Sequence, residues 1–369
     1  MTALPGTMLA ARAHDRTGGL ALEKIAVPEP GPEDVLVRVV SAGLAPSLMK
    51  LLARGSFKHL PSTPGHEIAG VVEAAGAEAD QGLVGARVRV HPVLSCGACR
   101  HCRTDREQMC GSSAMIGHGA HGRGPMPLYE RYHDGGLAEY VRVPARLVDR
   151  LPDAVGFDLG AKLHDLGNAH RALTSAGMPS EATLVITAAT GTMGTATIRL
   201  APFFGVTRLV LVARSAERLR AVRALSTVPV ETVALDTLDP DWPEQDELTA
   251  RLRELAPDGA DAVIDYLPQG SGTAQCVSAL ATGGALVHMG GNRTPLPFSA
   301  RDLQHRCWRI VGTRACTRSD TAAVLRLLGS GALTADELIT HRFPLAEVNE
   351  ALAHLENRDQ PIWMAVVQP

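Results

Sequence analysis

The sequence predicts an α/β protein built from a β-rich domain and a doubly wound domain with a parallel sheet. The chain has 369 residues, whereas a single hydrophobic core seldom grows beyond ~250–300 residues. Short strand-like runs separated by turns fill the chain up to about residue 154. From about residue 155, strand-like and helical runs alternate, as they do in parallel sheets covered by helices.

The composition favours a soluble protein without a nucleic-acid or membrane partner. Apolar residues make up 45% of the chain and the formal net charge is only −3, so no basic surface for nucleic acid or anionic lipid is expected. No apolar run approaches the ~18 residues that a membrane helix needs. The first residues lack a basic segment followed by a long apolar one, and we expect a cytoplasmic protein without a signal peptide.

The β-rich part begins with short runs that alternate between apolar and polar residues. Residues 34–40 form a clear strand pattern, preceded by a proline-rich loop at 28–32. A helical stretch follows residue 47, and further strand patterns cover 68–74, 85–90 and 137–143. These patterns predict an antiparallel domain over residues 1–154.

Four cysteines inside this domain form a metal-binding pattern. Cys96, Cys99, Cys102 and Cys110 follow the spacing C-x2-C-x2-C-x7-C, while the other three of the seven cysteines are scattered. Four thiolates in one short loop can surround a tetrahedral zinc and leave no position open for water. Free thiols and an iron–sulfur cluster are the alternatives. We predict a structural zinc that stabilises its lobe and does no chemistry.

Residues 111–136 are rich in glycine, histidine and proline, which predicts a long irregular loop. Such a loop could line the entrance of a substrate site. It carries His118, His121 and His133. We expect these to be solvated loop histidines, with metal binding as the alternative.

The first strand of the second part ends in a glycine-containing turn. Residues 183–188 are apolar and β-branched, and Ala189-Thr190-Gly191-Thr192-Met193-Gly194 leads into a helix. Gly191 would let backbone amides approach a pyrophosphate, and Gly194 would let the helix lie against the strand. The helix N-terminus, with Thr192 and Met193, offers N–H groups to phosphates. Since Ala189 replaces the first glycine of the G-x-G-x-x-G fingerprint, an ordinary strand-to-helix turn is the alternative.

Strand and helix patterns then alternate to residue 304, and we place the cofactor domain at 155–304. Residues 305–369 are expected to return mainly to the first domain. Strands are predicted at 208–213, 260–266, 284–289, 309–313, 338–343 and 362–367, and helices at 158–176, 192–204, 215–225, 246–255, 273–281, 319–329 and 345–356.

Several of these motifs together resemble the medium-chain dehydrogenase/reductase family, the zinc alcohol dehydrogenases and their relatives. They are Gly65-His66-Glu67, the four-cysteine lobe, residues 135–140, the turn at 183–194 and Gly283-Gly284. The resemblance covers nearly the whole chain. It implies a GroES-like catalytic domain, an inserted Rossmann domain, an active site in the cleft between them and a homodimer or homotetramer.

The residues after the second strand of the parallel sheet favour NADPH over NADH. Where an acidic residue would accept hydrogen bonds from the ribose of NAD, the chain has Ala213, followed by Arg214, Ser215 and Arg218. A guanidinium can pair with a 2′-phosphate. The alternative is that both arginines are simply solvated. We expect Leu267, Met289 and Gly290 to complete the cofactor site.

The family's catalytic zinc is not expected here. The resemblance implies His66 and Asp165 as ligands, but Ala45 takes the place of the ligand cysteine and Leu48 that of the aspartate that orients the histidine. Catalytic zinc sites use three protein ligands and water, and only two remain. Glu67 or His164 could compensate.

Without that metal, a simple ketone or alcohol lacks its activating Lewis acid. We therefore expect an NADPH-dependent reductase that transfers hydride to an electrophilic C=C or C=N bond of a small molecule. Ser47, His66, Glu67 and Asp165 are the candidate catalytic residues, with Ser47 as proton relay; Lys50, Tyr129, Tyr132 and His133 are other candidate donors. The alternatives are a zinc alcohol dehydrogenase with an atypical ligand set, and an NADPH-binding sensor or scaffold without turnover.

Overall fold

The computed structural model describes residues 4–120, 122–357 and 362–369. The chain divides into two compact units. The first comprises the chain up to His164 together with the segment from Thr317 onward, and the second comprises Asp165–Cys316. The second unit therefore begins and ends somewhat later than the expected 155–304. His121 lies outside the described residues.

The first unit is built around a seven-stranded mixed sheet. Its strand order is β16-β17-β3-β4-β5-β9, with β8 paired to β3, and every pair except β16 with β17 is antiparallel. The strands of this unit are β1 (Thr7–Arg12), β2 (Ala21–Ala26), β3 (Asp34–Leu44), β4 (Glu67–Ala75), β5 (Arg87–Val90), β6 (Val93–Leu94), β7 (Ala114–Met115), β8 (Tyr140–Pro144), β9 (Val148–Arg150), β16 (Ile339–Pro344) and β17 (Met364–Gln368).

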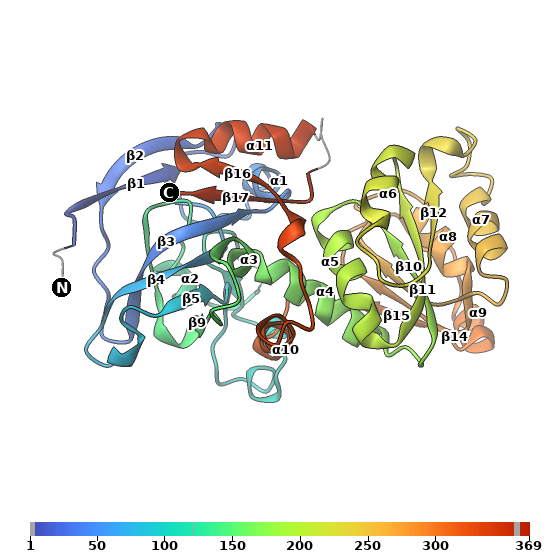
Figure 1. Ribbon diagram of the computed structural model, residues 1–369, viewed down its shortest axis with the longest axis horizontal. Helices are drawn as coiled ribbons and strands as arrows, with labels where there is room; N and C mark the ends of the chain where they lie inside the picture. Colours follow the sequence, from blue (N-terminus) through green and yellow to red (C-terminus); the bar gives the residue numbers. More distant parts are fainter. Residues whose placement is uncertain (1–3, 121, 358–361) are drawn as a thin grey trace. The chain divides into compact units, whose positions relative to one another are not determined.

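The long strand β3 is the centre of this sheet, as its alternating pattern predicts. Val35, Val37 and Val39 are all buried in the hydrophobic core of the unit. Helix α11 packs against β16 and β17 and covers that end of the sheet (Figure 1). The helices of this unit are α1 (Leu48–Ala53), α2 (Pro127–Arg131), α3 (Phe157–Ala161), α10 (Arg318–Gly329) and α11 (Val348–Asn357), and α4 (Leu163–Ala176) continues into the second unit.

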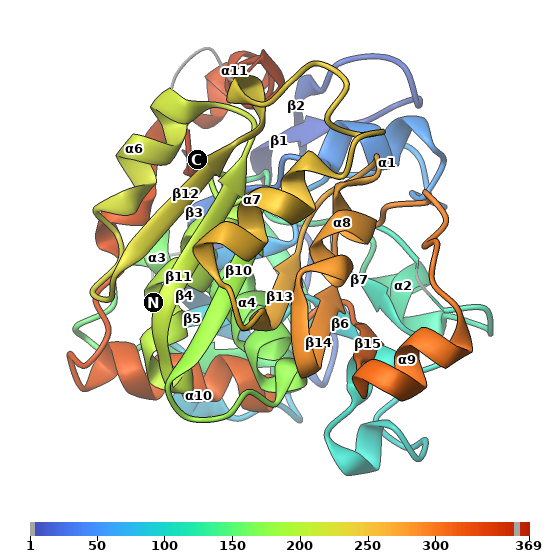
Figure 2. The same cartoon turned by 90° about the vertical axis from the view of Figure 1, so that its right-hand side faces the viewer.

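The second unit is a six-stranded, fully parallel sheet with the order β12-β11-β10-β13-β14-β15. Helices α5 and α6 cover one face, and α7 and α8 cover the other (Figures 1 and 2). The α/β fold predicted from the alternating pattern is confirmed. The elements are β10 (Ala182–Thr187), α5 (Thr192–Leu200), β11 (Val206–Ala213), α6 (Ala216–Arg223), β12 (Val230–Ala234), α7 (Glu247–Leu255), β13 (Ala260–Asp265), α8 (Gly272–Ser278), β14 (Leu280–His288), α9 (Ala300–Arg306) and β15 (Arg309–Gly312).

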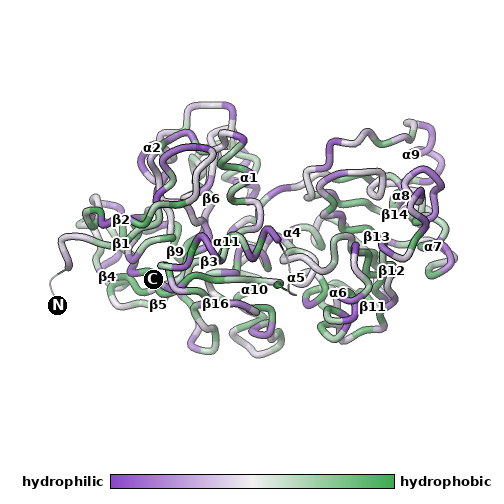
Figure 3. Tube along the Cα trace, turned by 90° about the horizontal axis from the view of Figure 1, so that it is seen from above, coloured by the Kyte–Doolittle hydropathy of each residue, from purple (hydrophilic) through white to green (hydrophobic). Residues whose placement is uncertain are grey.

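The chain order reverses between β10 and β13, which gives the sheet its switch point. In open α/β sheets, ligands bind outside the carboxyl ends of the strands at such a point. The central strands are mostly hydrophobic, whereas the segment around α9 is hydrophilic (Figure 3). Among the residues that the structure describes, no helix combines the length and the apolar character needed to cross a membrane.

Candidate functional site

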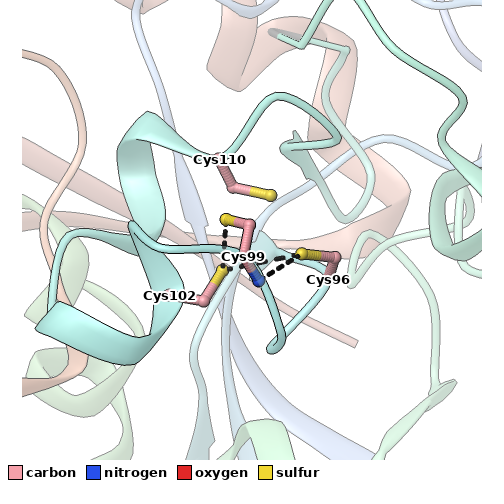
Figure 4. A group of neighbouring side chains, drawn as sticks. All are labelled: Cys96, Cys99, Cys102 and Cys110. Carbon is pink, nitrogen blue, oxygen red and sulfur yellow. Dashed lines mark hydrogen bonds between the residues drawn. The ribbon is translucent and has the colours of Figure 1, made fainter.

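The four cysteines predicted to bind zinc lie together in one lobe of the first unit (Figure 4). The Sγ atoms of Cys96 and Cys102 are 3.9 Å apart and those of Cys99 and Cys102 are 3.6 Å apart, and all four lie within 4.8 Å of one another. A tetrahedral zinc with Zn–S bonds of ~2.3 Å needs sulfur atoms separated by ~3.8 Å. The four side chains therefore fit a closed zinc site with no ligand position left for water.

The surroundings shift the pKa values of these cysteines in different directions. Backbone N–H groups of Ala98 and Cys99 lower the pKa of Cys96 to about 6, whereas burial raises the pKa of Cys102 to about 12. Four anionic sulfurs at this spacing repel one another unless a cation lies between them. The lobe is thus built for a bound dication.

In the second unit, the predicted phosphate turn joins β10 to α5. Ala188 adopts φ +47°, a left-handed conformation at the start of the turn. A Cβ added to Gly194 would lie 2.5 Å from Ala189 Cα, so glycine is required for α5 to approach the turn. Gly191 is the N-cap of α5 and carries no capping side chain, whereas Ser215 caps α6. No capping side chain of residue 191 therefore competes with an external anion at the N-terminus of α5.

The predicted NADPH-selecting residues surround the N-terminus of α6. Arg214 is exposed, Arg218 is half-buried, and Ser215 Oγ accepts a hydrogen bond from Arg218 N at 3.3 Å. The structure adds Asp236, whose backbone N–H donates to Arg214 O at 2.9 Å. Its carboxylate also accepts weakly from Ala216 N. Asp236 was missed because strand β12, which carries the chain to it, was not predicted.

Leu267, Met289 and Gly290 meet just beyond the carboxyl ends of β13 and β14. Met289 N donates to Asp265 O at 2.9 Å. A Cβ on Gly290 would lie 2.3 Å from Leu267 O, so this glycine is required by the close approach of the two loops. The structure thus brings these three predicted cofactor residues together at one edge of the sheet.

Glu67 is the first residue of strand β4 in the first unit, His66 precedes it, and Lys162 contacts Glu67. Lys162 Nζ donates to Glu67 Oε2 at 2.5 Å and to Leu44 O at 3.4 Å, and both ionic side chains are almost fully buried. His66 Nε2 lies 3.6 Å from Glu67 Oε1. The sequence analysis overlooked Lys162, although a single lysine within the apolar helical stretch at 157–167 was a signal.

Two other imidazoles lie against His66. Its ring centroid lies 4.5 Å from that of His118 and 5.2 Å from that of His164. Burial, and then the neighbouring His66, hold the pKa of His164 well below its ordinary value. His118 is buried, so the expectation of a solvated loop histidine was wrong for it. The reason is that its loop packs into the core, with Ile116 and Leu137 buried in the same cluster.

The residues around His66 do not match the family's catalytic zinc set. Ala45 and Leu48 are buried and carry no ligating atom. The Glu67 carboxylate is bound by the Lys162 ammonium, whose charge opposes a second cation close by.

The remaining candidate donors differ in their surroundings. Ser47 is exposed at the N-terminus of α1 and does not cap that helix through its side chain. Asp165 lies in the first turn of α4 and is buried. Tyr132 donates to the buried Asp34 at 2.5 Å, and burial followed by this bond raises its pKa to about 12. Tyr129 is buried in the core. Both tyrosines are structural, while Ser47 stays a candidate relay.

Two family models match the chain. The alcohol dehydrogenase GroES-like domain matches residues 31–153, and the zinc-binding dehydrogenase domain matches residues 192–330. A solved structure described as a zinc-binding dehydrogenase from Sinorhizobium meliloti, bound to NADP, is 26% identical with a TM-score of 0.84. The match covers 99% of this chain and 100% of that one.

Several similar proteins are named as dehydrogenases of different substrates. L-idonate 5-dehydrogenase of Vitis vinifera is 28% identical, with 89% of this chain and 86% of that protein covered. L-galactonate-5-dehydrogenase of Escherichia coli is 27% identical, with 88% of each covered. An NAD-dependent alcohol dehydrogenase of Saccharolobus solfataricus is 28% identical, with 92% of this chain and 93% of that protein covered.

Proposed function

Because the chain belongs to the medium-chain dehydrogenase/reductase family and is an oxidoreductase, we propose that it is an NADPH-dependent reductase that works without a catalytic zinc. Its substrate is a small molecule with an electrophilic C=C or C=N bond, such as an enone, an unsaturated aldehyde or an iminium. The Cys96, Cys99, Cys102 and Cys110 lobe holds one structural zinc.

The observation that carries this proposal is the Glu67–Lys162 ion pair beside His66. In a zinc-dependent active site, the metal supplies the positive charge that polarises a carbonyl or acidifies an alcohol. Here a buried ammonium is bound to Glu67, which lies beside His66, while Ala45 supplies no thiolate. A substrate that is already electrophilic requires only a positioned hydride and, for an alkene, a proton.

NADPH supplies the hydride when it is bound. The N–H groups at the start of α5 are suited to the pyrophosphate, and Arg214 and Arg218 to the 2′-phosphate. The loops that carry Leu267 and Gly290 border the carboxyl ends of β13 and β14. We propose that Ser47, whose side chain is exposed, relays a proton to a carbon or nitrogen of the substrate.

A second candidate is a zinc-dependent alcohol or polyol dehydrogenase. It is supported by the names of the relatives and by the three imidazoles of His66, His118 and His164. Imidazole is a good zinc ligand. Among the described residues, however, only the cysteine lobe brings three or more ligand atoms within 4.8 Å of one another.

The proposal is tested by following NADPH oxidation with a panel of enones, unsaturated aldehydes, cyclic imines, simple ketones and keto-sugar acids. Turnover confined to the first three classes supports the proposal. Turnover confined to ketones and keto-sugar acids favours the second candidate instead. Tight NADPH binding without oxidation by any compound would favour a sensor or scaffold and overturn the enzymatic proposal.

A further inference from the structure

A fully buried carboxylate, that of Asp265, connects three strand ends at the carboxyl edge of the parallel sheet. Asp265 is the last residue of β13, and its side chain accepts four hydrogen bonds. The donors are Thr187 Oγ1 at 2.6 Å, Leu267 N at 3.3 Å, Thr273 Oγ1 at 2.8 Å and His288 Nδ1 at 2.6 Å. Thr187 ends β10 and His288 ends β14. One carboxylate therefore links the ends of β10, β13 and β14.

His288 extends this hydrogen-bond network to the loop after β14. Its Nδ1 lies against the carboxylate and carries the proton, so Nε2 is left as an acceptor. Nε2 accepts from Gly291 N at 2.9 Å and from Asn292 N at 3.1 Å. The imidazole thus folds residues 288–292 into a tight turn, in which Gly291 adopts φ +76°.

Asn292 closes the network onto the loop after β13. Its Nδ2 donates to Gly270 O at 2.8 Å and to Thr273 Oγ1 at 2.9 Å. Gly270 N in turn donates to Thr294 Oγ1 at 3.2 Å. Both loops that carry the predicted cofactor residues Leu267, Met289 and Gly290 are therefore held in one arrangement that begins at Asp265.

The sheet order indicates which half of the cofactor this network serves. A dinucleotide lies across the switch point, which here falls between β10 and β13. The arginines at 214 and 218 follow β11 and mark the side of the adenosine half. The loops after β13 and β14 then border the nicotinamide half.

We propose that Asp265 and His288 are positioning residues for the nicotinamide half of the cofactor, an inference that rests on the proposed cofactor function. They act through the loops and touch no reacting atom. Asp265 is the charged side chain that the described residues place against His288, whose other hydrogen-bonding neighbours are backbone N–H groups.

The test compares the dissociation constants of NADPH and of 2′,5′-ADP, which lacks the nicotinamide half. His288→Leu removes the donor and the acceptor together, and we expect it to weaken NADPH binding about tenfold while 2′,5′-ADP binding stays within about twofold. His288→Gln offers one donor and one acceptor. It should restore most of the NADPH affinity.

The comparison of NADPH with 2′,5′-ADP separates positioning of the nicotinamide half from a general structural role. Unchanged NADPH binding in His288→Leu, or equal loss for both ligands, would overturn the proposal. The same variants are also measured with NADH and 5′-AMP. If the wild type prefers that pair, the NADPH assignment fails while the positioning claim is still tested.

Discussion

Single residues decide the chemistry of the first unit, and Lys162 is the most informative of them. Its ammonium is bound to Glu67 in an almost fully buried pair next to His66. A buried charge without its partner is costly, whereas removal of both partners leaves no uncompensated charge. Single and double substitutions of this pair should therefore differ measurably in their free energies of unfolding.

We predict that Lys162→Met lowers the free energy of unfolding by about 3–5 kcal/mol, because Glu67 then stays buried without its partner. The double variant Lys162→Met with Glu67→Gln should recover most of this loss. Urea unfolding of the wild type, both single variants and the double variant measures the effect. Additive losses in the double variant would show that the two side chains do not act as a pair.

Arg214 gives a prediction about the cofactor. Arg214→Asp should weaken NADPH binding roughly 10–100-fold, since it replaces a charged hydrogen bond to the 2′-phosphate with repulsion. NADH binding should change little. Arg220→Asp, on the exposed surface of the same helix, is the matched control. An unaltered preference for NADPH in Arg214→Asp would mean that another loop recognises the 2′-phosphate.

His91 gives a prediction about pH. Burial, and then the charge of Arg89, hold the pKa of His91 well below its ordinary value, with Arg318 and Arg146 contributing in the same direction. The folded chain keeps this imidazole neutral, whereas the unfolded chain protonates it below about pH 6.5. Its contribution is therefore fully present above that pH and is lost as the pH falls, by up to about 1.4 kcal/mol per pH unit.

Urea unfolding at about pH 7.5 and about pH 5.5 checks this sign. The wild type should lose more stability on acidification than His91→Gln, which cannot titrate. Equal losses in the two proteins would mean that His91 is protonated in the folded state.

Residues whose role depends on neighbours in the sequence could be predicted, and those whose role depends on burial could not. The four cysteines lie within one short loop, and their spacing alone indicated a metal lobe. His118 was expected to be solvated and Lys162 was overlooked, because their contacts with His66 and Glu67 join residues that are far apart in the sequence. Tyr132 was considered a proton donor to the substrate, but its hydroxyl donates a hydrogen bond to the buried Asp34.

At the scale of elements, two glycines in the turn between β10 and α5 have different expected roles. Gly194 is needed for packing, and Gly191 for cofactor binding. Gly194→Ala should destabilise the protein by about 1–3 kcal/mol, because its Cβ would clash with the backbone of Ala189. Gly191→Ala is the matched control, since its Cβ would meet only Ala188 O, at 3.3 Å. That variant should fold normally but bind NADPH more weakly, because the methyl group lies at the start of α5. Thermal unfolding and NADPH titration distinguish the two effects.

Elements with a strong apolar period were predicted, and weakly patterned ones were not. Strands β10, β11 and β13 are almost continuously apolar and buried. The edge strand β12 has the sequence Val-Glu-Thr-Val-Ala, whose polar residues reflect its position at the margin of the sheet. Helix α9 has no buried residue. It is defined by its capping box at Ser299 and Asp302, a local signal that the sequence analysis did not use.

At the scale of the whole molecule, the alternation of strands and helices was sufficient to predict an inserted parallel-sheet domain. The boundaries were less certain, because helix α4 runs across the first of them without a break. The second boundary is followed at once by the capping box of α10 at Thr317. There, Arg318 N donates to Glu107 of the cysteine lobe at 2.6 Å. The lobe therefore holds the segment by which the chain returns to the first unit.

The zinc content of the active protein tests the central claim most directly. Purified enzyme, shown to reduce an enone or imine with NADPH, is assayed for zinc per subunit before and after mild chelation. We predict about one zinc per subunit, held by the four cysteines, and full activity after chelation. About two zinc ions per subunit, with activity lost on chelation and restored by added zinc, would contradict reduction without a catalytic metal.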